Sequence, residues 1–412
     1  MATTIGACGG ECGVLTPGGH ISLIAGTPTF STTTFRSGLR SIRCNAAAAA
    51  VTYSLSEVES GQLTANGVGV LRFYIYFATA LPDGDTILAD ATFVKSCGLF
   101  FQASDSKLYS RANGVNGATG ATVTTGTWYL IDMRLTADGT ASNVTVDVTV
   151  NGVALTSPAA GLNGGASNRW RLGVVAAVTA DVFFDDILAS GTSIDYPLGG
   201  GYILSYIPNA DGTHNVAGAN DFERTLTGTD IDNSTTDAYE LVNDRPMESA
   251  AGDFINGKAP PNSTDYVEIA YEDSVESAAP RSVEAIVGYH DAGGAGTNNF
   301  SVTLRSGATT ADIMAAATRN VGATMSWGRA HFTTIPGGTA WTLAAFNALL
   351  SRLLVSDPSP DVYLDGLMLE AEYAPVSANP NSEGESGLHA IGRGAVAGHN
   401  TAVRLGGWLE YA

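Results

Sequence analysis

Positive charge is scarce in this chain. Its 412 residues include 20 Lys and Arg against 40 Asp and Glu, which gives a formal net charge of −20. Its lysines are Lys95, Lys107 and Lys258. Proteins that bind DNA or RNA use a basic face to displace the counterions of the phosphates. The composition therefore argues against nucleic acid as a partner, and it disfavours an anionic membrane surface for the same reason.

Long apolar runs are also missing. The sequence has no stretch of about 18 apolar residues, which is the length that a membrane-spanning helix needs. The first residues, MATTIGACGGECGV, have neither the basic segment nor the apolar core of a signal peptide. We therefore expect no membrane insertion, and we expect a protein that is made and matures in a cytoplasm.

Cysteine is rare. The chain has Cys8, Cys12, Cys44 and Cys97, and the first two lie four positions apart in ACGGECG. A zinc site would need further ligands, and of the histidines only His20 is close in sequence. A disulfide between the first two cysteines could form only after the cell opens, because cytoplasm is reducing. Free thiols, this disulfide and a zinc site are the three alternatives.

Known catalytic motifs are absent. The sequence has no G-x-S-x-G, H-E-x-x-H or Walker-type loop, and its six histidines are scattered. Two carboxylate pairs, Glu268 with Glu272 and Asp181 with Asp185, could lie on one face of a strand, as a glycosidase would need. Acids on the solvent face of a strand are ordinary. We therefore predict no catalytic residue, no cofactor and no enzymatic activity.

Oxygen-rich turns raise the question of a metal. Residues 82–86 (PDGDT), 209–214 (NADGTH) and 228–237 (GTDIDNSTTD) cluster oxygen atoms. None of them matches the twelve-residue calcium loop with its closing Glu, and Asp-Gly turns are common in β proteins without metal. We therefore predict no metal site, with a structural Ca²⁺ as the alternative.

What the chain does have is the pattern of an all-β protein. Hydrophobic residues make up 44%, and there are 49 glycines, as expected of large cores built from strands with many turns. In residues 143–153, NVTVDVTVNGV, valines alternate with Thr and Asp. This alternation predicts a strand with one buried and one exposed side. Many such strands at short spacing predict antiparallel β-sandwiches of jelly-roll type.

The chain divides into three parts. We expect one β-sandwich in residues 1–197, a hinge at YPLGGGY, and a second sandwich in residues 203–374. Similar segments close the two sandwiches, ADVFFDDILAS at residues 180–190 and PDVYLDGLMLE at residues 360–370, which indicates a shared architecture. Their apolar character predicts that each closing strand lies in the middle of a sheet.

Residues 375–412 are expected to form a linker and a C-terminal interaction tail. The segment PVSANPNSEGESG is polar and contains Pro and Ser, which is typical of a linker. The mildly apolar tail after it is too short to build a core of its own. Contact with a partner is the favoured interpretation, with packing onto its own sandwich and disorder as alternatives. The predicted contact residues are Leu388, Ile391, Val403, Leu405, Trp408 and Tyr411.

One helix is predicted near the end of the second sandwich. Over Thr342–Leu354, apolar residues such as Leu343 and Phe346 recur at helical spacing. Thr342 is placed to cap the first turn, with Trp341 before it as half of a hydrophobic staple. SDPSP follows and would end the helix. We expect this helix to connect the last two strands of the sandwich.

This helix and the strand after it resemble the end of a domain found in many structural proteins of tailed bacteriophages. The resemblance rests on PGGTAWTLAAFNAL followed by DVYLDGLMLEAEY, and on SVEAIVGYHDAGGAGTNNFSVTLRSG, which resembles the central hairpin of that domain. It covers about residues 220–374. The chain departs from the pattern where PGG stands in place of a more acidic D-P-x-T-G.

The N-terminal part is similar to laminin-G-like or concanavalin-like sandwiches. A GTWY strand is followed by a long alternating strand that ends in NGV, and DVFFDDILAS closes the unit, so that most of residues 15–190 are covered. Such sandwiches often bind glycans, and they also occur in phage tail and capsid-surface proteins. The aromatic residues that could line a groove, although each is expected in the core, are Trp128, Tyr129, Trp170 and Trp327.

These resemblances imply a structural protein on the surface of a tailed-phage virion, as a capsid decoration or as a tail or fibre component. Its partners would be other virion proteins, further copies of itself in a homo-oligomer, and host-surface glycans. It would be assembled into the virion in the host cytoplasm. The alternatives are a concanavalin-like carbohydrate-active enzyme and a secreted glycan-binding module.

Overall fold

In the computed structural model, the described part of the chain consists mainly of β-strands that pair into antiparallel sheets. The described residues are 4–11, 21–45, 50–54, 68–91, 97–137, 144–158, 169–192, 195–216, 222–224, 230–244, 254–257, 265–291, 298–319, 326–355 and 362–375.

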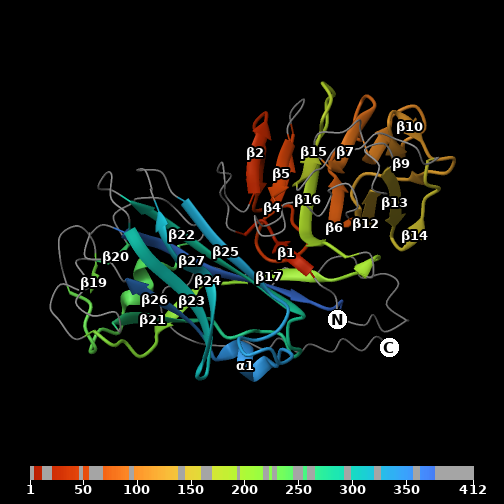
Figure 1. Ribbon diagram of the computed structural model, residues 1–412. Coiled ribbons are helices and arrows are strands. Elements are labelled where there is room, and N and C mark those ends of the chain that lie inside the picture. The colour runs from red at the N-terminus through yellow and green to blue at the C-terminus, as the bar shows by residue number, and fades with distance from the viewer. Residues whose placement is uncertain are drawn as a thin grey trace, which may run out of the picture. The chain divides into compact units, whose positions relative to one another are not determined.

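The first sandwich consists of two eight-stranded antiparallel sheets (Figure 1). Sheet 1 contains, in spatial order, β14 (Val153–Ala154), β13 (Val144–Val150), β12 (Trp128–Ala137), β6 (Val68–Phe77), β16 (Val182–Ser190), β4 (Ser41–Cys44) and β3 (Thr29–Ser31), with β1 (Thr4–Cys8) also paired to β16. Sheet 2 contains β10 (Val115–Asn116), β9 (Lys107–Ala112), β8 (Gly98–Gln102), β7 (Thr86–Ala91), β15 (Arg169–Gly173), β5 (Ala50–Ser54) and β2 (Ile21–Ala25), with β11 (Ala121–Thr122) also paired to β9.

The second sandwich consists of a six-stranded and a five-stranded antiparallel sheet. Sheet 3 contains β19 (Phe222–Glu223), β20 (Ile255–Gly257), β27 (Val362–Tyr373), β22 (Ser282–Asp291) and β25 (Ser326–Phe332), with β17 (Tyr202–Tyr206) also paired to β27. Sheet 4 contains β18 (Pro208–Asp211), β21 (Tyr266–Tyr271), β26 (Leu349–Val355), β23 (Asn298–Ser306) and β24 (Thr309–Arg319). The predicted all-β fold of antiparallel sandwiches is therefore confirmed.

The two sandwiches share one topology. The order β12-β6-β16-β4-β3 in sheet 1 corresponds to β25-β22-β27-β20-β19 in sheet 3, and β8-β7-β15-β5-β2 in sheet 2 corresponds to β24-β23-β26-β21-β18 in sheet 4. β1 and β17 pair with the closing strands β16 and β27 in the same way. The corresponding strands also follow the same order along the chain, which is what duplication of one sandwich would give. Both closing strands lie in the middle of a sheet, as predicted.

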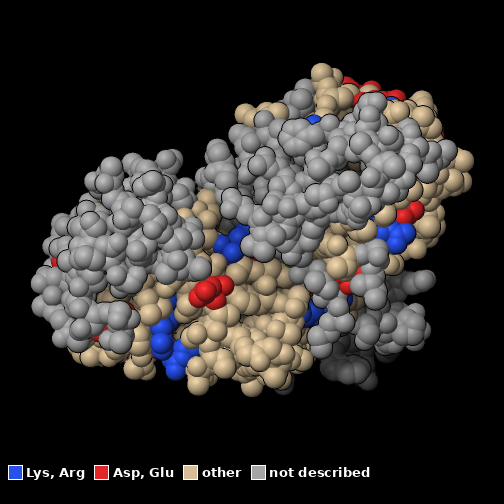
Figure 2. All heavy atoms as spheres, in the orientation of Figure 1, with Lys and Arg blue, Asp and Glu red and all other residues tan. Residues whose placement is uncertain are grey.

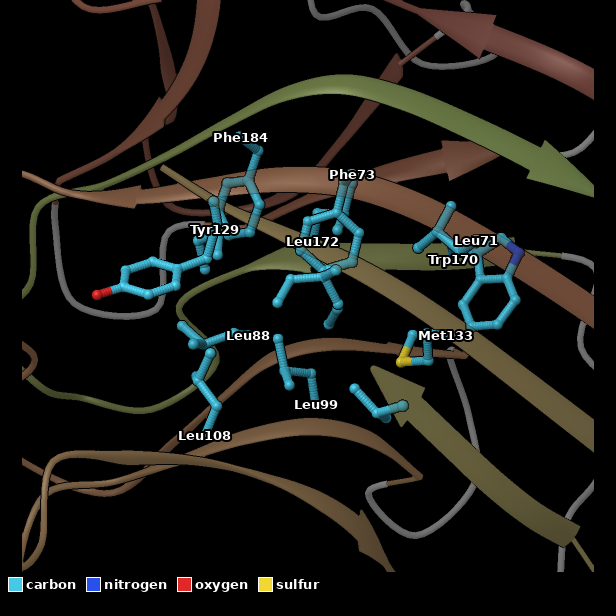
Figure 3. Packing of buried hydrophobic residues seen from close by; sticks show 14 of the residues in the cluster. Leu71, Phe73, Leu88, Leu99, Leu108, Tyr129, Met133, Trp170, Leu172 and Phe184 are labelled. Atoms are coloured by element: carbon cyan, nitrogen blue, oxygen red, sulfur yellow. The ribbon is translucent and has the colours of Figure 1, made fainter. Parts of the chain in front are cut away.

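Each sandwich encloses its own hydrophobic core. On β6, Leu71 and Phe73 are among the residues that alternate toward the first core, which Figure 3 shows from close by. On β13, Val146 and Val148 are buried, as the alternation of valines predicts. Burying a side chain of this size stabilises the fold by roughly 1.5–3 kcal/mol.

The predicted helix is shorter than its sequence pattern. α1 spans Leu343–Asn347 only, and the residues from Leu349 onward form β26. The helix therefore connects β25 to β26, and the prediction that it connects the last two strands is wrong. The start of the helix is as predicted, because the Thr342 hydroxyl accepts a hydrogen bond from the Ala345 N–H at 3.1 Å. The error lies in the leucine doublets, which fit both a helical period and the alternation of a strand.

Helices play a small part in the described structure. Apart from α1, the structure has the short 3₁₀ helix η3 (Ala238–Leu241). Within the described ranges, no helix is long and apolar enough to span a membrane.

Candidate functional site

Several side chains on the outer face of sheet 1 are buried, although this face points away from the core of the sandwich. Leu71 and Phe73 of β6 point into the core, so Arg72, Tyr74 and Tyr76 lie on the opposite face. Arg72 is nevertheless fully buried and Tyr74 is 7% exposed, whereas Tyr76 is half-buried. The face therefore has a covered part, which we call the junction, and an open part.

The junction is where the two sandwiches meet. Arg72 of sheet 1 donates a hydrogen bond to Glu372 of sheet 3 at 2.7 Å, and the exposed fractions of the two side chains are 0% and 3%. Arg281 also donates to this carboxylate. Between the sandwiches, the Gly199 N–H donates to Asp132 at 3.2 Å. Because an unpaired buried charge costs several kcal/mol, these groups depend on partners from both halves of the chain.

Two adjacent aspartates of β16 also lie in the junction. The pairing of β16 with β6 shifts register after Asp185, and Asp186 has a φ of 51°. Asp185 accepts a hydrogen bond from the backbone N–H of Arg36 at 2.7 Å. Asp186 accepts one from the Arg36 guanidinium at 2.5 Å and one from the Ile203 N–H at 2.6 Å. The bulge thus lets Asp186 join β16 to the segment that begins the second sandwich.

The electrostatics of the junction reflect this burial. Burial raises the pKa of Asp185 well above its ordinary value, and the charge of Asp186 raises it further. Burial also raises the pKa of Asp132, although the charge of Arg72 acts in the opposite direction. Protonation of Asp185 and Asp132 therefore lowers the free-energy cost of burying these two carboxyl groups.

The N-terminal strand is part of the same junction. β1 pairs with β16, and the Ala7 N–H donates to Glu284 of sheet 3 at 3.4 Å. Glu11, which is fully buried, accepts a hydrogen bond from the Leu39 N–H at 2.6 Å. Its own N–H donates to Glu370 of sheet 3 at 3.3 Å. The first residues of the chain therefore connect both sandwiches.

The open part of the face carries a row of aromatic side chains. Trp128 of β12 lies opposite Tyr76 of β6, which lies opposite Phe183 of β16. The ring centroids are 5.1 Å apart in the first pair and 5.9 Å apart in the second. Next in the row is Arg43 of β4, whose guanidinium donates two hydrogen bonds to Asp181 at 2.8 and 2.9 Å. We call these five residues the aromatic row.

The aromatic row is only partly open to solvent. Trp128 and Tyr76 are half-buried, whereas Phe183 is 3% exposed. The Arg43 guanidinium lies 5.4 Å from the centroid of the Phe183 ring. The accessible surface of the row therefore consists of two rings with an ion pair at one end.

The surface charge agrees with the composition. On the face that Figure 2 shows, most of the described surface is uncharged, and Lys and Arg form small groups near Asp and Glu. A nucleic-acid interface would show a continuous basic stripe. This face does not have one within the described residues.

The structure does not bring the two candidate carboxylate pairs together as catalytic dyads. Glu268 is fully buried, and one of its oxygens accepts hydrogen bonds from Arg305 at 2.6 Å and from Arg352 at 2.7 Å. Four residues along a strand span about 13 Å, which places Glu272 too far away for a shared substrate bond. Asp181 and Asp185 have the same spacing, and the second of them is buried in the junction.

The four aromatic residues that were expected in the core, with a groove as the alternative, are dispersed in the structure. Trp170 is fully buried and Tyr129 is 8% exposed, so both belong to the first core. Trp327 is half-buried and packs beside Ile286 and Met368 on the second sandwich. Trp128 alone among these four residues lies in the aromatic row.

The oxygen-rich turns use their carboxylates to hold backbone groups. Asp83 accepts a hydrogen bond from the Thr179 N–H at 2.7 Å. Asp211 accepts two from the first turn of η3, at 2.8 and 2.9 Å, and Asp232 accepts one from the Ser234 N–H at 2.7 Å. No group of three or more potential metal ligands occurs within the described ranges.

The structure describes only some of the remaining candidate site residues, which are the cysteines, His20 and the contact residues of the tail. Cys8, Cys44 and Cys97 are buried thiols, and burial raises the pKa of Cys44 to about 12. Cys12 and His20 lie outside the described residues. So do all the predicted contact residues of the tail, which are Leu388, Ile391, Val403, Leu405, Trp408 and Tyr411.

Sequence reasoning missed the charged residues of the junction. They occur inside otherwise apolar strands, as in VLRFYIYF of β6 and LMLEAEY of β27. A charge in the middle of a central strand is a usable signal, because such a residue is rarely buried without a partner. The residues that this signal would have found are Arg72, Glu370 and Glu372.

Comparison with known proteins gives little at the level of sequence. No protein-family model matches the chain, and no curated protein matches it. Solved structures show similarity of fold alone. One is the tandem CBM22-1–CBM22-2 domain of Xyn10C from Paenibacillus barcinonensis, with 10% identity over 90% of this chain and 98% of that chain, at a TM-score of 0.27.

Two further solved structures each match a part of this chain that is about as long as one sandwich. A carbohydrate esterase from the Shiga toxin-encoding bacteriophage phi24B shows 12% identity over 42% of this chain and 90% of that chain, at a TM-score of 0.31. The catalytic domain of a glycoside hydrolase family 131 protein from Coprinopsis cinerea shows 16% identity over 42% of this chain and 84% of that chain, at a TM-score of 0.30. At these TM-scores, the similarities carry no argument about function.

Proposed function

We propose that this chain is a structural protein on the surface of a tailed-phage virion, as a capsid decoration or as a tail or fibre component. The observation that carries the proposal is the junction, in which Arg72, Asp186 and Glu372 are buried and bonded across the two sandwiches. A protein that bears load in a particle needs domains that do not move independently. A junction of paired buried charges supplies that, because opening it would expose each charge without its partner.

The chemistry of the described carboxylates supports a non-catalytic role. Glu268 is held by two arginines, and Asp185 and Glu11 accept hydrogen bonds from backbone N–H groups. A catalytic acid or base must reach a substrate, directly or through one water molecule. These carboxyl groups instead serve the fold. For this reason we do not favour the carbohydrate-active enzyme, the alternative that the sequence left open.

Attachment to the particle is assigned to the C-terminal tail, and the copies would act together. Weak contacts that repeat over a lattice or fibre give firm attachment without any single tight site. Other virion proteins and further copies of this chain are the partners that this role requires. A secreted glycan-binding module remains the second candidate, and the aromatic row is the observation that favours it.

The proposal can be tested on particles of the phage whose genome encodes the chain. Particles purified on a density gradient are analysed by quantitative mass spectrometry, with the major capsid protein as the internal standard. We expect the chain in many copies per particle, at a fixed ratio to the capsid protein. Its absence from intact particles, together with its presence in the culture fluid, would favour the secreted module instead.

A further inference from the structure

We propose that the aromatic row of sheet 1 is a binding site for a neutral oligosaccharide built of pyranose rings. The inference goes beyond the proposed structural role, and it assigns the glycan contact that the sequence resemblance implied to named residues. Trp128 and Tyr76 would stack against successive sugar rings, and the Arg43–Asp181 pair would bind sugar hydroxyls at the end of the row.

The spacing of the row suits a chain of rings. Trp128, Tyr76 and Phe183 come from three adjacent strands and lie directly opposite one another. Neighbouring strands are about 4.8 Å apart, so the row crosses the sheet in a straight line roughly 10 Å long. A pyranose ring carries C–H groups on its faces and hydroxyl groups at its edge. The flat apolar surface of Trp or Tyr can pack against the C–H groups, and a polar group beside it can bind the hydroxyl groups.

The polar end of the row has hydrogen-bonding capacity left. The side chains of Arg43 and Asp181 are 38% and 21% exposed. A guanidinium has five N–H donors, and two of those on Arg43 are used by Asp181. A carboxylate that accepts two hydrogen bonds can accept more. The pair can therefore both donate to and accept from hydroxyl groups.

The charge of the site selects for a neutral ligand. Arg43 and Asp181 neutralise each other within the row, so no net positive charge is left to attract an acidic sugar. The whole chain has a formal net charge of −20, which repels anions at long range. An oligosaccharide of neutral hexoses avoids this repulsion.

A protein partner fits the row less well. A stable protein interface buries roughly 800 Å² on each side, whereas only two half-buried rings are accessible here. The large hydrophobic residues that are most exposed in the described part of the chain, Val115, Val153 and Val275, do not belong to the row. A second copy would bring the same negative charge. A small, flat and neutral ligand matches both the area and the charge.

The test uses the full chain and two neutral probes, cellohexaose and β-1,4-galactohexaose, with trigalacturonic acid as the anionic comparison. Binding is followed by isothermal titration calorimetry and by the indole N–H signals in ¹H–¹⁵N NMR spectra. We expect at least one neutral probe to bind and to shift the Trp128 signal, while the signal of the buried Trp170 stays in place. Failure of both neutral probes to bind, or binding of the anionic probe alone, would overturn the proposal.

Variants locate the site. Trp128→Ala should lower the affinity by about tenfold, and Trp128→Phe by less, because a ring remains. Val153→Ala, an exposed change in the same sheet, should leave the affinity unchanged. Thermal melting of each variant shows whether it is folded, and the NMR shift in the wild-type chain does not depend on any variant. Equal affinity in Trp128→Ala and the wild type would place the sugar elsewhere and contradict the proposal.

The outcome is separable from that of the virion proposal. If the chain is found in particles but binds no neutral sugar, the aromatic row is not a glycan site and the structural role stands. If sugar binds at the row but particles lack the chain, the structural role fails and the site stands.

Discussion

Arg72 and Glu372 lie 300 residues apart in sequence, and their side chains meet at 2.7 Å across the junction of the two sandwiches. Each sandwich supplies one partner. Arg72 also donates hydrogen bonds to the carbonyl oxygens of Asp186 and Gly199, at 3.4 to 3.5 Å. Within its own sandwich Arg72 lies opposite Asp132, whose pKa its charge lowers. The direct ion pair of Arg72 with Glu372, however, forms only when the two sandwiches are in contact.

Glu372→Gln tests this dependence. The change keeps the shape of the side chain but removes the carboxylate to which the buried Arg72 donates its hydrogen bond at 2.7 Å, so we expect a loss of about 3–5 kcal/mol in the free energy of unfolding. The matched control is Asp147→Asn, which removes the carboxylate of Arg134 from the same sheet face, where both side chains are 31% exposed. That pair should contribute less than about 1 kcal/mol. Urea denaturation of both variants gives the comparison, and equal losses would contradict the account.

The pH dependence of stability has a definite sign. Burial, and then the charge of Asp186, raises the pKa of Asp185 above its ordinary value of 3.8. A group whose pKa is raised by folding stabilises the folded protein fully at pH values below its pKa in the unfolded chain. This contribution is lost as the pH rises through its pKa in the folded protein. Burial raises the pKa of Asp90 and Asp132 as well, so these groups act in the same direction.

We therefore predict that, for these groups, the free energy of unfolding falls as the pH rises above the ordinary aspartate pKa of 3.8 and through their raised pKa values in the folded state. Asp185→Asn removes one titrating group, so its profile should be flatter than that of the wild type. Denaturation midpoints measured across this range provide the test. A variant profile as steep as that of the wild type would show that Asp185 does not titrate as described.

The start of α1 offers a local test. Thr342 accepts a hydrogen bond from the Ala345 N–H, and Trp341 packs against Phe346 with ring centroids 6.3 Å apart. Thr342→Ala should lower the free energy of unfolding by about 1 kcal/mol, because an N–H of the first turn loses its acceptor. Thr342→Ser keeps the hydroxyl and should retain most of the stability. If the two variants melt at the same temperature, the cap does not contribute.

The tail is tested by deletion of residues 388–412. The described second sandwich ends with β27 at Tyr373, so its sheets should fold without the tail. We expect the shortened chain to melt at the same temperature as the full chain, but to be absent from purified particles. Particles that carry the shortened chain in normal amount would show that the tail is not the anchor.

Local pattern predicted the strands well and the helix only in part. The valines of β13 show a single alternation, and the structure follows it. Leu349, Leu350, Leu353 and Leu354 fit two periods at once. This segment forms the strand β26 because it pairs with both β21 and β23, whose residues are far away in sequence.

The site was harder to predict than the fold. The two closing segments indicated a shared architecture. The topology of the two sandwiches extends this correspondence to every described strand of the second. The junction depends on how the sandwiches dock, and no local period in the sequence encodes that. The aromatic row depends on register across three strands. Trp128 could be named from the sequence, but its neighbours Tyr76 and Phe183 could not be assigned to it.

The central claim of a virion surface role is tested most directly by immunogold electron microscopy of purified particles, with antibody raised against the recombinant chain. We predict gold on every intact particle, distributed either over the capsid or along the tail and its fibres. Gold on the capsid would identify a decoration protein, and gold on the tail would identify a tail or fibre component. Particles without gold, under conditions in which the antibody labels the free protein, would contradict the account.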